Sequence, residues 1–183
     1  MCKWELGFLT QRHIVIETYQ IEWEQEYKRE VGRISRIIHP VLRAIHHIGS
    51  TSIPGMSAKP TIDILAEVSD LPSLDRISSR MDPLGYESYG ENGIAGRRYF
   101  CKTDAEGNHL VHLHIFEEGT EDVVRHLAFR DYLKVHADDA AFYSNLKEQL
   151  AAAFPYDAES YIQGKDAAVK KIEERALLWW YGE

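Results

Sequence analysis

The sequence predicts an α+β fold, because helical and strand-like patterns occupy separate blocks along the chain. Residues 23–38 carry apolar side chains at helical spacing, and Pro40 closes this helix. From Thr61 the apolar period changes to two, which is the period of a strand. Residues 121–183 return to helical periodicity, so the chain is expected to end in a helical third.

Each expected element rests on periodicity and on the turn residues that border it. The strand-like segments are short apolar or alternating runs, at 14–16, 46–48, 61–68, 86–89, 97–102 and 110–116. The expected helices lie at 23–38, 71–81, 121–136, 138–153 and 161–181. Turn sequences at 91–93 and 106–108 separate the last three strands, which predicts an antiparallel meander.

Composition limits the class of protein. A length of 183 residues predicts one domain, residues 1–183, with a sheet-containing core at about 14–120 and a helical part at 121–183. The formal charge of −8 argues against nonspecific nucleic-acid binding, which needs a basic surface. Two cysteines cannot form a disulfide framework, no apolar run approaches the roughly 20 residues of a membrane span, and no signal peptide is evident. We therefore expect a cytoplasmic protein with no membrane partner.

The most informative segment is a small, hydroxyl-rich turn that precedes the strand at 61–68. The turn consists of Gly49, Ser50, Thr51 and Ser52. Glycine lets the backbone approach a ligand, and hydroxyl groups bind phosphate oxygens, so these four residues and Lys59 are candidate phosphate-binding residues. Serine and threonine also cap helices, and the pattern leaves that structural interpretation open.

Asp63 is the candidate metal-binding and catalytic carboxylate on the strand that follows. It shares a strand face with Leu65 and Glu67, opposite the apolar Ile62 and Ile64. Two-metal phosphoryl transfer uses acids at neighbouring positions on one face, and Leu65 occupies the second of these positions. Glu67 lies about 13 Å from Asp63 along a strand, which makes a solvated glutamate the favoured interpretation.

Two histidines, His112 and His114, are the other candidate catalytic and metal-binding residues. They alternate with Val111, Leu113 and Ile115, so both imidazoles face away from the apolar side of their strand. With Asp63 they would form a site of two histidines and one carboxylate for a divalent metal. Proton transfer and phosphate binding are equally compatible with imidazole chemistry, so these roles stay open.

The run from His47 through Gly49, Ser50 and Lys59 to Ile64 resembles the signature of the GrpB family, which is also found fused to dephospho-CoA kinase. The resemblance extends over about residues 14–178. The further segments that match the family lie at 19–23, 85–86, 98–100, 112–114, 129–133, 143, 147, 161 and 165. Because the signature is long, it identifies the chain as a member of this family.

The resemblance implies a nucleotidyltransferase-type fold related to the polymerase-β superfamily, a mixed sheet with flanking helices. In that superfamily a Gly-Ser turn binds nucleotide phosphates, and paired acids on a later strand hold magnesium. Gly49-Ser50 and Asp63 match these features. Leu65 departs from the pattern, because it stands where the second acid is expected.

The resemblance also draws attention to basic residues. It favours Arg98 over Arg97 as a phosphate-binding residue, since neighbouring strand residues face opposite ways and only one can face the site. Arg130 is a candidate phosphate clamp, with pairing to a carboxylate as the alternative. Lys147 and Lys165 match the family, but a solvated helix face is the favoured interpretation of both.

These observations lead to one functional hypothesis and two alternatives. The leading hypothesis is a nucleotidyltransferase-fold protein that binds a nucleotide or nucleotide-like phosphate, with metal-dependent nucleotidyl transfer through magnesium as its reaction. The first alternative is a catalytically silent module for a nucleotide or coenzyme A. The second is a metal-dependent hydrolase that uses Asp63, His112 and His114. The missing second carboxylate leaves open whether the protein is an enzyme.

Overall fold

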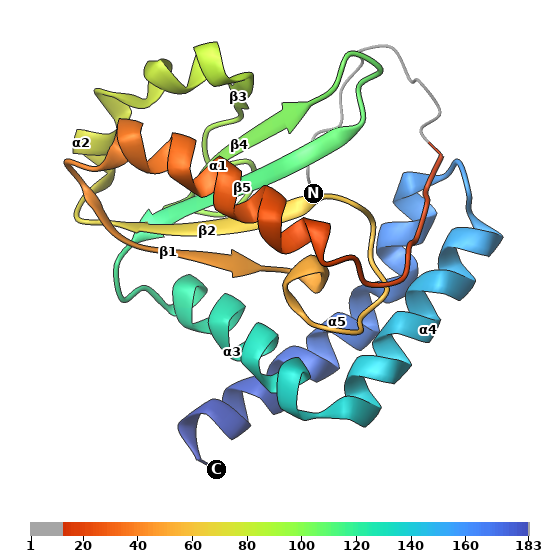
Figure 1. Ribbon diagram of the computed structural model, residues 1–183. Coiled ribbons are helices and arrows are strands. Elements are labelled where there is room, and N and C mark those ends of the chain that lie inside the picture. Colours follow the sequence, from red (N-terminus) through yellow and green to blue (C-terminus); the bar gives the residue numbers. More distant parts are fainter. Residues whose placement is uncertain (1–12, 183) are drawn as a thin grey trace.

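The computed structural model describes residues 13–182, and its centre is a five-stranded mixed sheet (Figure 1). The strands are β1 (Leu42–Ile48), β2 (Ile62–Val68), β3 (Tyr86–Ser88), β4 (Arg98–Thr103) and β5 (His109–Glu117). Their order in the sheet is β1-β2-β5-β4-β3. The central pair β2 and β5 is parallel, and the other neighbours are antiparallel. The expected antiparallel meander of the last three strands is therefore confirmed.

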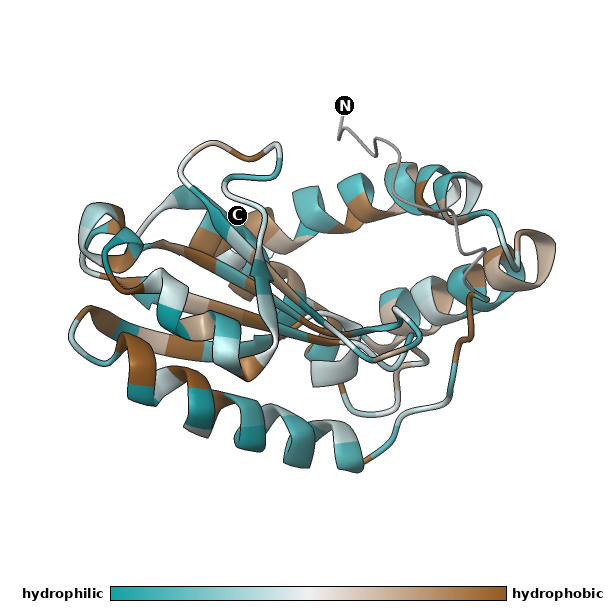
Figure 2. Ribbon diagram, turned by 90° about the horizontal axis from the view of Figure 1, so that it is seen from above, coloured by the Kyte–Doolittle hydropathy of each residue, from teal (hydrophilic) through white to brown (hydrophobic). Residues whose placement is uncertain are grey.

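Helices cover both faces of this sheet. They are α1 (Glu22–Ile38), α2 (Leu71–Asp75), α3 (Glu121–Val135), α4 (Ala137–Ala153) and α5 (Ala158–Tyr181), with 3₁₀ segments η1 (Ser50–Ser52) and η2 (Ser78–Leu84). Seen from above, α1 lies along one side of the sheet and the helices of the C-terminal third lie on the other side (Figure 2). No helix within residues 13–182 combines the length and apolarity needed to cross a membrane.

The two faces of β2 pack into different hydrophobic clusters. Ile62, Ile64 and other residues of even number join α1 and α2 in the main core. Leu65, on the opposite face, packs with Ile48 of β1, Phe116 of β5 and Val123 of α3. This packing holds α3 against the sheet beside the polar residues of β2 and β5.

Three expectations need correction. The helix expected at 71–81 is divided into α2 and the 3₁₀ segment η2, which extends to Leu84 and contains Pro83, a residue without the N–H of an α-helical bond. The run at 14–16 forms no strand, and only the neighbouring Glu17 makes an isolated bridge, with Ala58. The four-residue spacing of Phe142, Leu146 and Leu150 predicts that these residues form the apolar side of α4, but Phe142 is 55% exposed and the buried side holds Tyr143 and Lys147.

Candidate functional site

Three polar side chains form a row across the middle of the sheet. Asp63 of β2 is aligned with His112 of β5, and His112 is aligned with Cys101 of β4. Aligned residues of neighbouring strands share a face, so these groups lie on the side opposite the main core. Two of the three residues expected to cluster, Asp63 and His112, are thereby brought into direct contact.

Asp63, His112 and His109 make a continuous hydrogen-bonded chain. Nδ1 of His112 lies 3.1 Å from Oδ1 of Asp63, and Nε2 of His112 lies 2.7 Å from Nδ1 of His109. Burial alone would lower the pKa of His112, but its hydrogen bonds to Asp63 and Cys101 raise this pKa to about 9. Burial would raise the pKa of Asp63, yet the bond to His112 and the nearby charges keep that pKa below its usual value.

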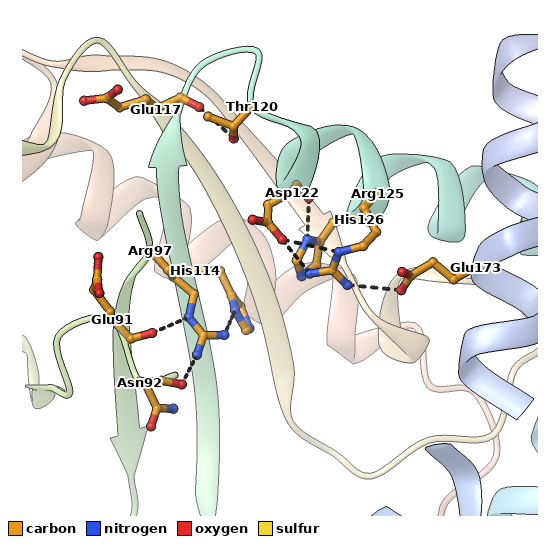
Figure 3. Close-up of polar contacts among 10 residues, drawn as sticks. All are labelled: Glu91, Asn92, Arg97, His114, Glu117, Thr120, Asp122, Arg125, His126 and Glu173. Atoms are coloured by element: carbon orange, nitrogen blue, oxygen red, sulfur yellow. Dashed lines mark hydrogen bonds and ion pairs between the residues drawn. The ribbon is translucent and has the colours of Figure 1, made fainter. Parts of the chain in front are cut away.

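His114 lies in the next row of the same face and is held by Arg97. The guanidinium of Arg97 donates to the main-chain oxygens of Glu91 and Asn92, and its Nη1 lies 3.4 Å from Nδ1 of His114 (Figure 3). Burial, followed by the charges of His126 and Arg97, lowers the pKa of His114 to about 3. His114 is therefore a neutral imidazole that accepts at Nδ1 and offers an Nε2–H donor.

Helix α3 closes this side of the cluster. Its His126 lies with a ring centroid 5.6 Å from that of His114, and the imidazole Nδ1 donates to the main-chain oxygen of Asp122 (Figure 3). Arg125 pairs with Asp122 on its own helix and with Glu173 of α5. The last contact joins α3 to α5 within the helical third.

The glycine of the hydroxyl-rich turn lies directly against Asp63. Gly49 has φ +69°, and a Cβ atom added there would lie 2.3 Å from Oδ2 of Asp63. Only glycine accommodates both the positive φ and this approach. The turn and the carboxylate, predicted from separate segments, are neighbours in space.

The three hydroxyl groups of the turn have different environments. Ser50 Oγ accepts a 2.8 Å hydrogen bond from Nζ of Lys147. Thr51 is 2% exposed, and its Oγ1 contacts Nε2 of His47 and the main-chain oxygen of Thr61. Ser52 Oγ donates back to the main-chain oxygen of Gly49. Ser50 and Ser52 are half-buried, so these two remain accessible to a ligand, while Thr51 stabilises the turn.

Lys147 is buried rather than on a solvated helix face, which corrects the favoured expectation. It is 3% exposed and donates to both Ser50 Oγ and the main-chain oxygen of Ser57. Burial, followed by the charge of Lys165, lowers the pKa of Lys147 to about 7. A lysine near its titration point thus holds the hydroxyl-rich turn against α4.

Two more lysines approach the same region from the loop before β2 and from α5. Nζ of Lys59 lies 5.1 Å from the ring centroid of Tyr161, and Nζ of Lys165 lies 5.6 Å from it. The charge of Lys165 contributes to lowering the pKa of Asp63. His112 of β5 and Lys165 of α5 thus both lower the pKa of Asp63, in a protein of net negative charge.

Two predicted phosphate-binding arginines are placed differently from the expectation. Arg98 lies on the opposite face of β4, where its guanidinium binds both carboxylate oxygens of Asp75 at 2.8 Å. The strand alternation that sends Arg97 to the site sends Arg98 away from it. Arg130 binds both oxygens of Asp131 and donates to the main-chain oxygen of His47, which is the carboxylate pairing left open by the sequence.

The expected metal ligands are also arranged differently. Among residues 13–182, the group with three ligand atoms within 4.8 Å of one another is Cys101, His109 and His112, without Asp63 or His114. Leu65 is fully buried in an apolar cluster, and Glu67 pairs with His46 at a distance of 2.8 Å. With one carboxylate in the cluster, these residues do not fit a pair of magnesium ions bridged by two acids.

Sequence reasoning missed Tyr99, Cys101 and His109, and it set Arg97 aside in favour of Arg98. Tyr99 and Cys101 alternate on β4 and are aligned with His114 and His112, and Arg97, directly before β4, contacts His114, so the period of two contained a usable signal. His109 precedes His112 by three positions and would face the other way in a regular strand. A register shift between Lys102 and Thr103, where Leu110 has no partner, turns His109 toward His112.

Comparison with protein families matches residues 13–175 to the family described as GrpB protein. The chain belongs to the GrpB family. It is 45% identical over 171 residues to the UPF0157 protein YqkA of Bacillus subtilis, covering 93% of this chain and 49% of that protein. The glutamate-rich protein GrpB of Alkalihalophilus pseudofirmus is 32% identical over 162 residues, covering 87% of this chain and 93% of that protein. The GrpB chain thus spans about half the length of YqkA.

Solved structures agree with the fold. The crystal structure of GrpB from Enterococcus faecalis matches with a TM-score of 0.87 and 37% identity, covering 91% of this chain and 99% of that chain. The poly(U) polymerase Cid1 with MgGTP bound matches with a TM-score of 0.51 and 14% identity, covering 74% of this chain and 44% of that chain. The GrpB chain therefore has a nucleotidyltransferase-type fold, as its sequence resemblance implied.

One further relative bears on the family resemblance. A dephospho-CoA kinase of Mycolicibacterium paratuberculosis is 25% identical over 184 residues, covering 86% of this chain and 44% of that protein. A GrpB-like segment thus occurs within a protein of that name, which agrees with the fusion that the resemblance implied.

Proposed function

We propose that this GrpB protein binds a nucleotide or nucleotide-like phosphate between the polar face of its sheet and its helical third. The observation that carries the proposal is the approach of Gly49 to Asp63, with Ser50 tied to Lys147 beside it. In this account Ser50, whose oxygen accepts from Lys147, donates its hydroxyl proton to a phosphate oxygen. Ser52 does the same by exchanging its hydrogen bond to the Gly49 carbonyl for one to phosphate. Lys147 and Lys165 supply charge, since an ammonium group is a common phosphate ligand.

The electrostatics favour an anionic ligand. Lys147 is held near its titration point by burial and by Lys165. A phosphate dianion beside Lys147 would raise the pKa of its ammonium group, so that Lys147 would be fully protonated when the ligand is bound. On β5, His114 is neutral above its pKa of about 3, and its Nε2–H can donate to a phosphate oxygen without the ring being protonated. Together these groups compensate phosphate charge without a large basic surface.

Nucleotidyl transfer by two magnesium ions is not part of the proposal. Leu65 fills the position of the second acid, and its burial against Phe116 and Val123 serves the packing of α3. Asp63 is already hydrogen-bonded to His112. These two observations favour binding over two-metal catalysis in this chain.

Coenzyme A is the second candidate ligand class, favoured by the similarity to a protein named dephospho-CoA kinase. Coenzyme A contains an adenosine nucleotide and a pyrophosphate, so it presents the same phosphate chemistry to the turn. Its longer arm would need additional contacts, and this difference lets a ligand panel separate the two classes.

Thermal unfolding with a ligand panel tests the proposal. The panel holds the four nucleoside triphosphates, coenzyme A, and each matching nucleoside without phosphate, with and without magnesium. Phosphorylated compounds should raise the unfolding temperature, and a ligand at 100 times its dissociation constant should add about 2.7 kcal/mol. Nucleosides should leave the temperature unchanged.

A pair of lysine variants locates the effect. Lys59→Ala, beside Tyr161, should reduce the ligand-induced shift, whereas Lys28→Ala, an exposed residue of α1 paired with Glu24, should preserve it. Equal stabilisation by nucleosides and triphosphates, or no stabilisation by any phosphorylated compound, would contradict the proposal.

A further inference from the structure

Cys101, His109 and His112 form a cluster of soft and borderline metal ligands beside the phosphate-binding region. One ligand atom from each residue lies within 4.8 Å of the other two. Cys101 is buried with a free thiol, and both histidines are partly accessible. A thiolate and two imidazoles are the ligands that zinc prefers, while magnesium prefers oxygen.

The backbone brings these three residues together by a specific irregularity. Cys101 and His112 are aligned on neighbouring strands and share a face. His109 would face the other way, but the unpaired Leu110 re-aims it, as bulges do beside functional sites. The resulting contact places Nδ1 of His109 2.7 Å from Nε2 of His112.

The separation of the two histidine nitrogens suits a tetrahedral ion after a small adjustment. Zinc–nitrogen bonds of about 2.0–2.1 Å at tetrahedral angles separate two imidazole nitrogens by about 3.3 Å. The two histidine nitrogens would therefore move apart by roughly 0.6 Å. A bound ion would replace the proton that now joins them, and three protein ligands would leave a fourth position open.

Asp63 supplies the outer contact that metal-binding histidines usually have. Its Oδ1 accepts from Nδ1 of His112, and Nε2 of the same ring points toward His109 and Cys101. A carboxylate–histidine–metal arrangement of this kind orients the ring and increases its basicity. The carboxylate assigned to the phosphate site would thus also support a metal centre.

We propose that Cys101, His109 and His112 bind one zinc-class divalent ion, with Asp63 as the carboxylate behind His112. This site differs in ligands and in chemistry from the magnesium site expected at Asp63, His112 and His114. Metal binding at this site requires no nucleotide, so it is tested independently of the proposed function.

Cobalt(II) titration tests the site directly. The full chain is reduced with a phosphine, freed of metal with a chelator and titrated with cobalt(II), whose bond to a thiolate gives a near-ultraviolet charge-transfer band. The band should saturate at one equivalent and disappear when zinc is added. Its absence from the wild-type protein would overturn the proposal.

Variants assign the ligands. Cys2→Ser removes the other thiol of the chain and should keep the band, whereas loss of the band in this variant would overturn the assignment to Cys101. In the Cys2→Ser background, His109→Gln should weaken cobalt binding by at least tenfold. His46→Gln, a matched histidine of β1 paired with Glu67, should bind as tightly as its parent.

The partly accessible His109 keeps the test decisive even where Cys101→Ser, a change in the core, fails to fold. Circular dichroism of His109→Gln checks that the fold is retained. Asp63→Asn should lower metal affinity by roughly 10–100-fold, as expected for an outer-shell carboxylate. Unchanged affinity in His109→Gln would refute the site.

Discussion

The α-carbon of Gly49 lies so close to the carboxylate of Asp63 that a Cβ atom at position 49 would stand 2.3 Å from Oδ2. Gly49 directly follows Ile48, the last residue of β1, and Ile48 is aligned with Asp63 of β2. The contact fixes the hydroxyl-rich turn against the acid, so it defines one wall of the proposed phosphate site.

Replacing Gly49 by alanine should therefore disrupt both stability and ligand binding. The added methyl group meets a carboxylate and requires a positive φ, and backbone strain of this kind costs about 1–3 kcal/mol. Gly55→Ala is a matched control, since Gly55 also has positive φ but has open space around its α-carbon.

Urea unfolding followed by circular dichroism compares the two variants. Gly49→Ala should lose more free energy of unfolding than Gly55→Ala, and only Gly49→Ala should lose the stabilisation by triphosphate. Equal losses in both variants would show that the approach to Asp63 has no energetic consequence.

Leu65→Asp tests whether the second acid position belongs to the core. Leu65 is fully buried with Ile48, Phe116 and Val123. An unpaired carboxylate there costs several kcal/mol, so the variant should unfold or be severely destabilised rather than gain a magnesium site. Leu65→Met, which conserves volume, should cost less than about 1.5 kcal/mol. A stable Leu65→Asp protein that binds magnesium would contradict this view.

The two neighbouring arginines at the start of β4, Arg97 just before the strand and Arg98 as its first residue, should behave differently. Arg98 pairs with Asp75 at a partly exposed position on the far face, so Arg98→Met should cost about 1 kcal/mol or less and leave ligand binding unchanged. Arg97 supports two main-chain oxygens and His114, so Arg97→Met should cost about 1–3 kcal/mol and weaken binding. Calorimetric binding and urea unfolding measure both effects; the opposite ranking would place the ligand on the Arg98 face.

The lowered pKa of Lys147 predicts that the free energy of unfolding depends on pH. Its pKa is about 7 in the folded protein and 10.5 as the ordinary value, so between these pH values the unfolded chain binds a proton that the folded chain does not. Stability should then rise with pH across this window. Lys165 on α5 strengthens the shift, while Asp63 on β2 and Glu148 on α4 oppose it.

Lys147→Met isolates this contribution. The variant lacks the hydrogen bonds to Ser50 and Ser57, which lowers its stability by the same amount at every pH. It also lacks the titrating amine, which removes the part of the stability that changes with pH. The free energy of unfolding of wild type should rise relative to that of the variant from pH 7 to pH 10. A constant difference over this range would show that Lys147 stays protonated in the folded state.

Local pattern was sufficient to predict most of the fold. The stripe from Trp23 to Ile38 predicted α1, and the alternation from Ile62 to Val68 predicted both faces of β2, because burial of one face selects one periodicity. The predictions that were wrong concern residues whose burial is determined by tertiary packing. In α4 Phe142 and Tyr143 are neighbouring aromatic residues, and it is Tyr143 that is buried, in a cluster with Ile53 and residues of α3 and α5.

The site was predictable only where it follows regular strands. Asp63 and His112 are in contact as expected, since both lie on predicted polar faces. His109 depends on a bulge that no pattern indicates. Lys147 depends on which face of α4 is buried, and its burial contradicts the usual exposure of lysine. Long-range placement of charges therefore escaped sequence reasoning.

The central claim is that lysines of the helical third and the turn at Gly49 share one anionic ligand. Calorimetric titration of Lys165→Glu with nucleoside triphosphate tests it most directly, alongside Lys170→Glu, an exposed lysine on another face of α5. The account predicts at least tenfold weaker binding for Lys165→Glu and less than about a twofold change for Lys170→Glu, because opposing charge acts strongly only at short range. Equal affinities in the two variants would contradict it.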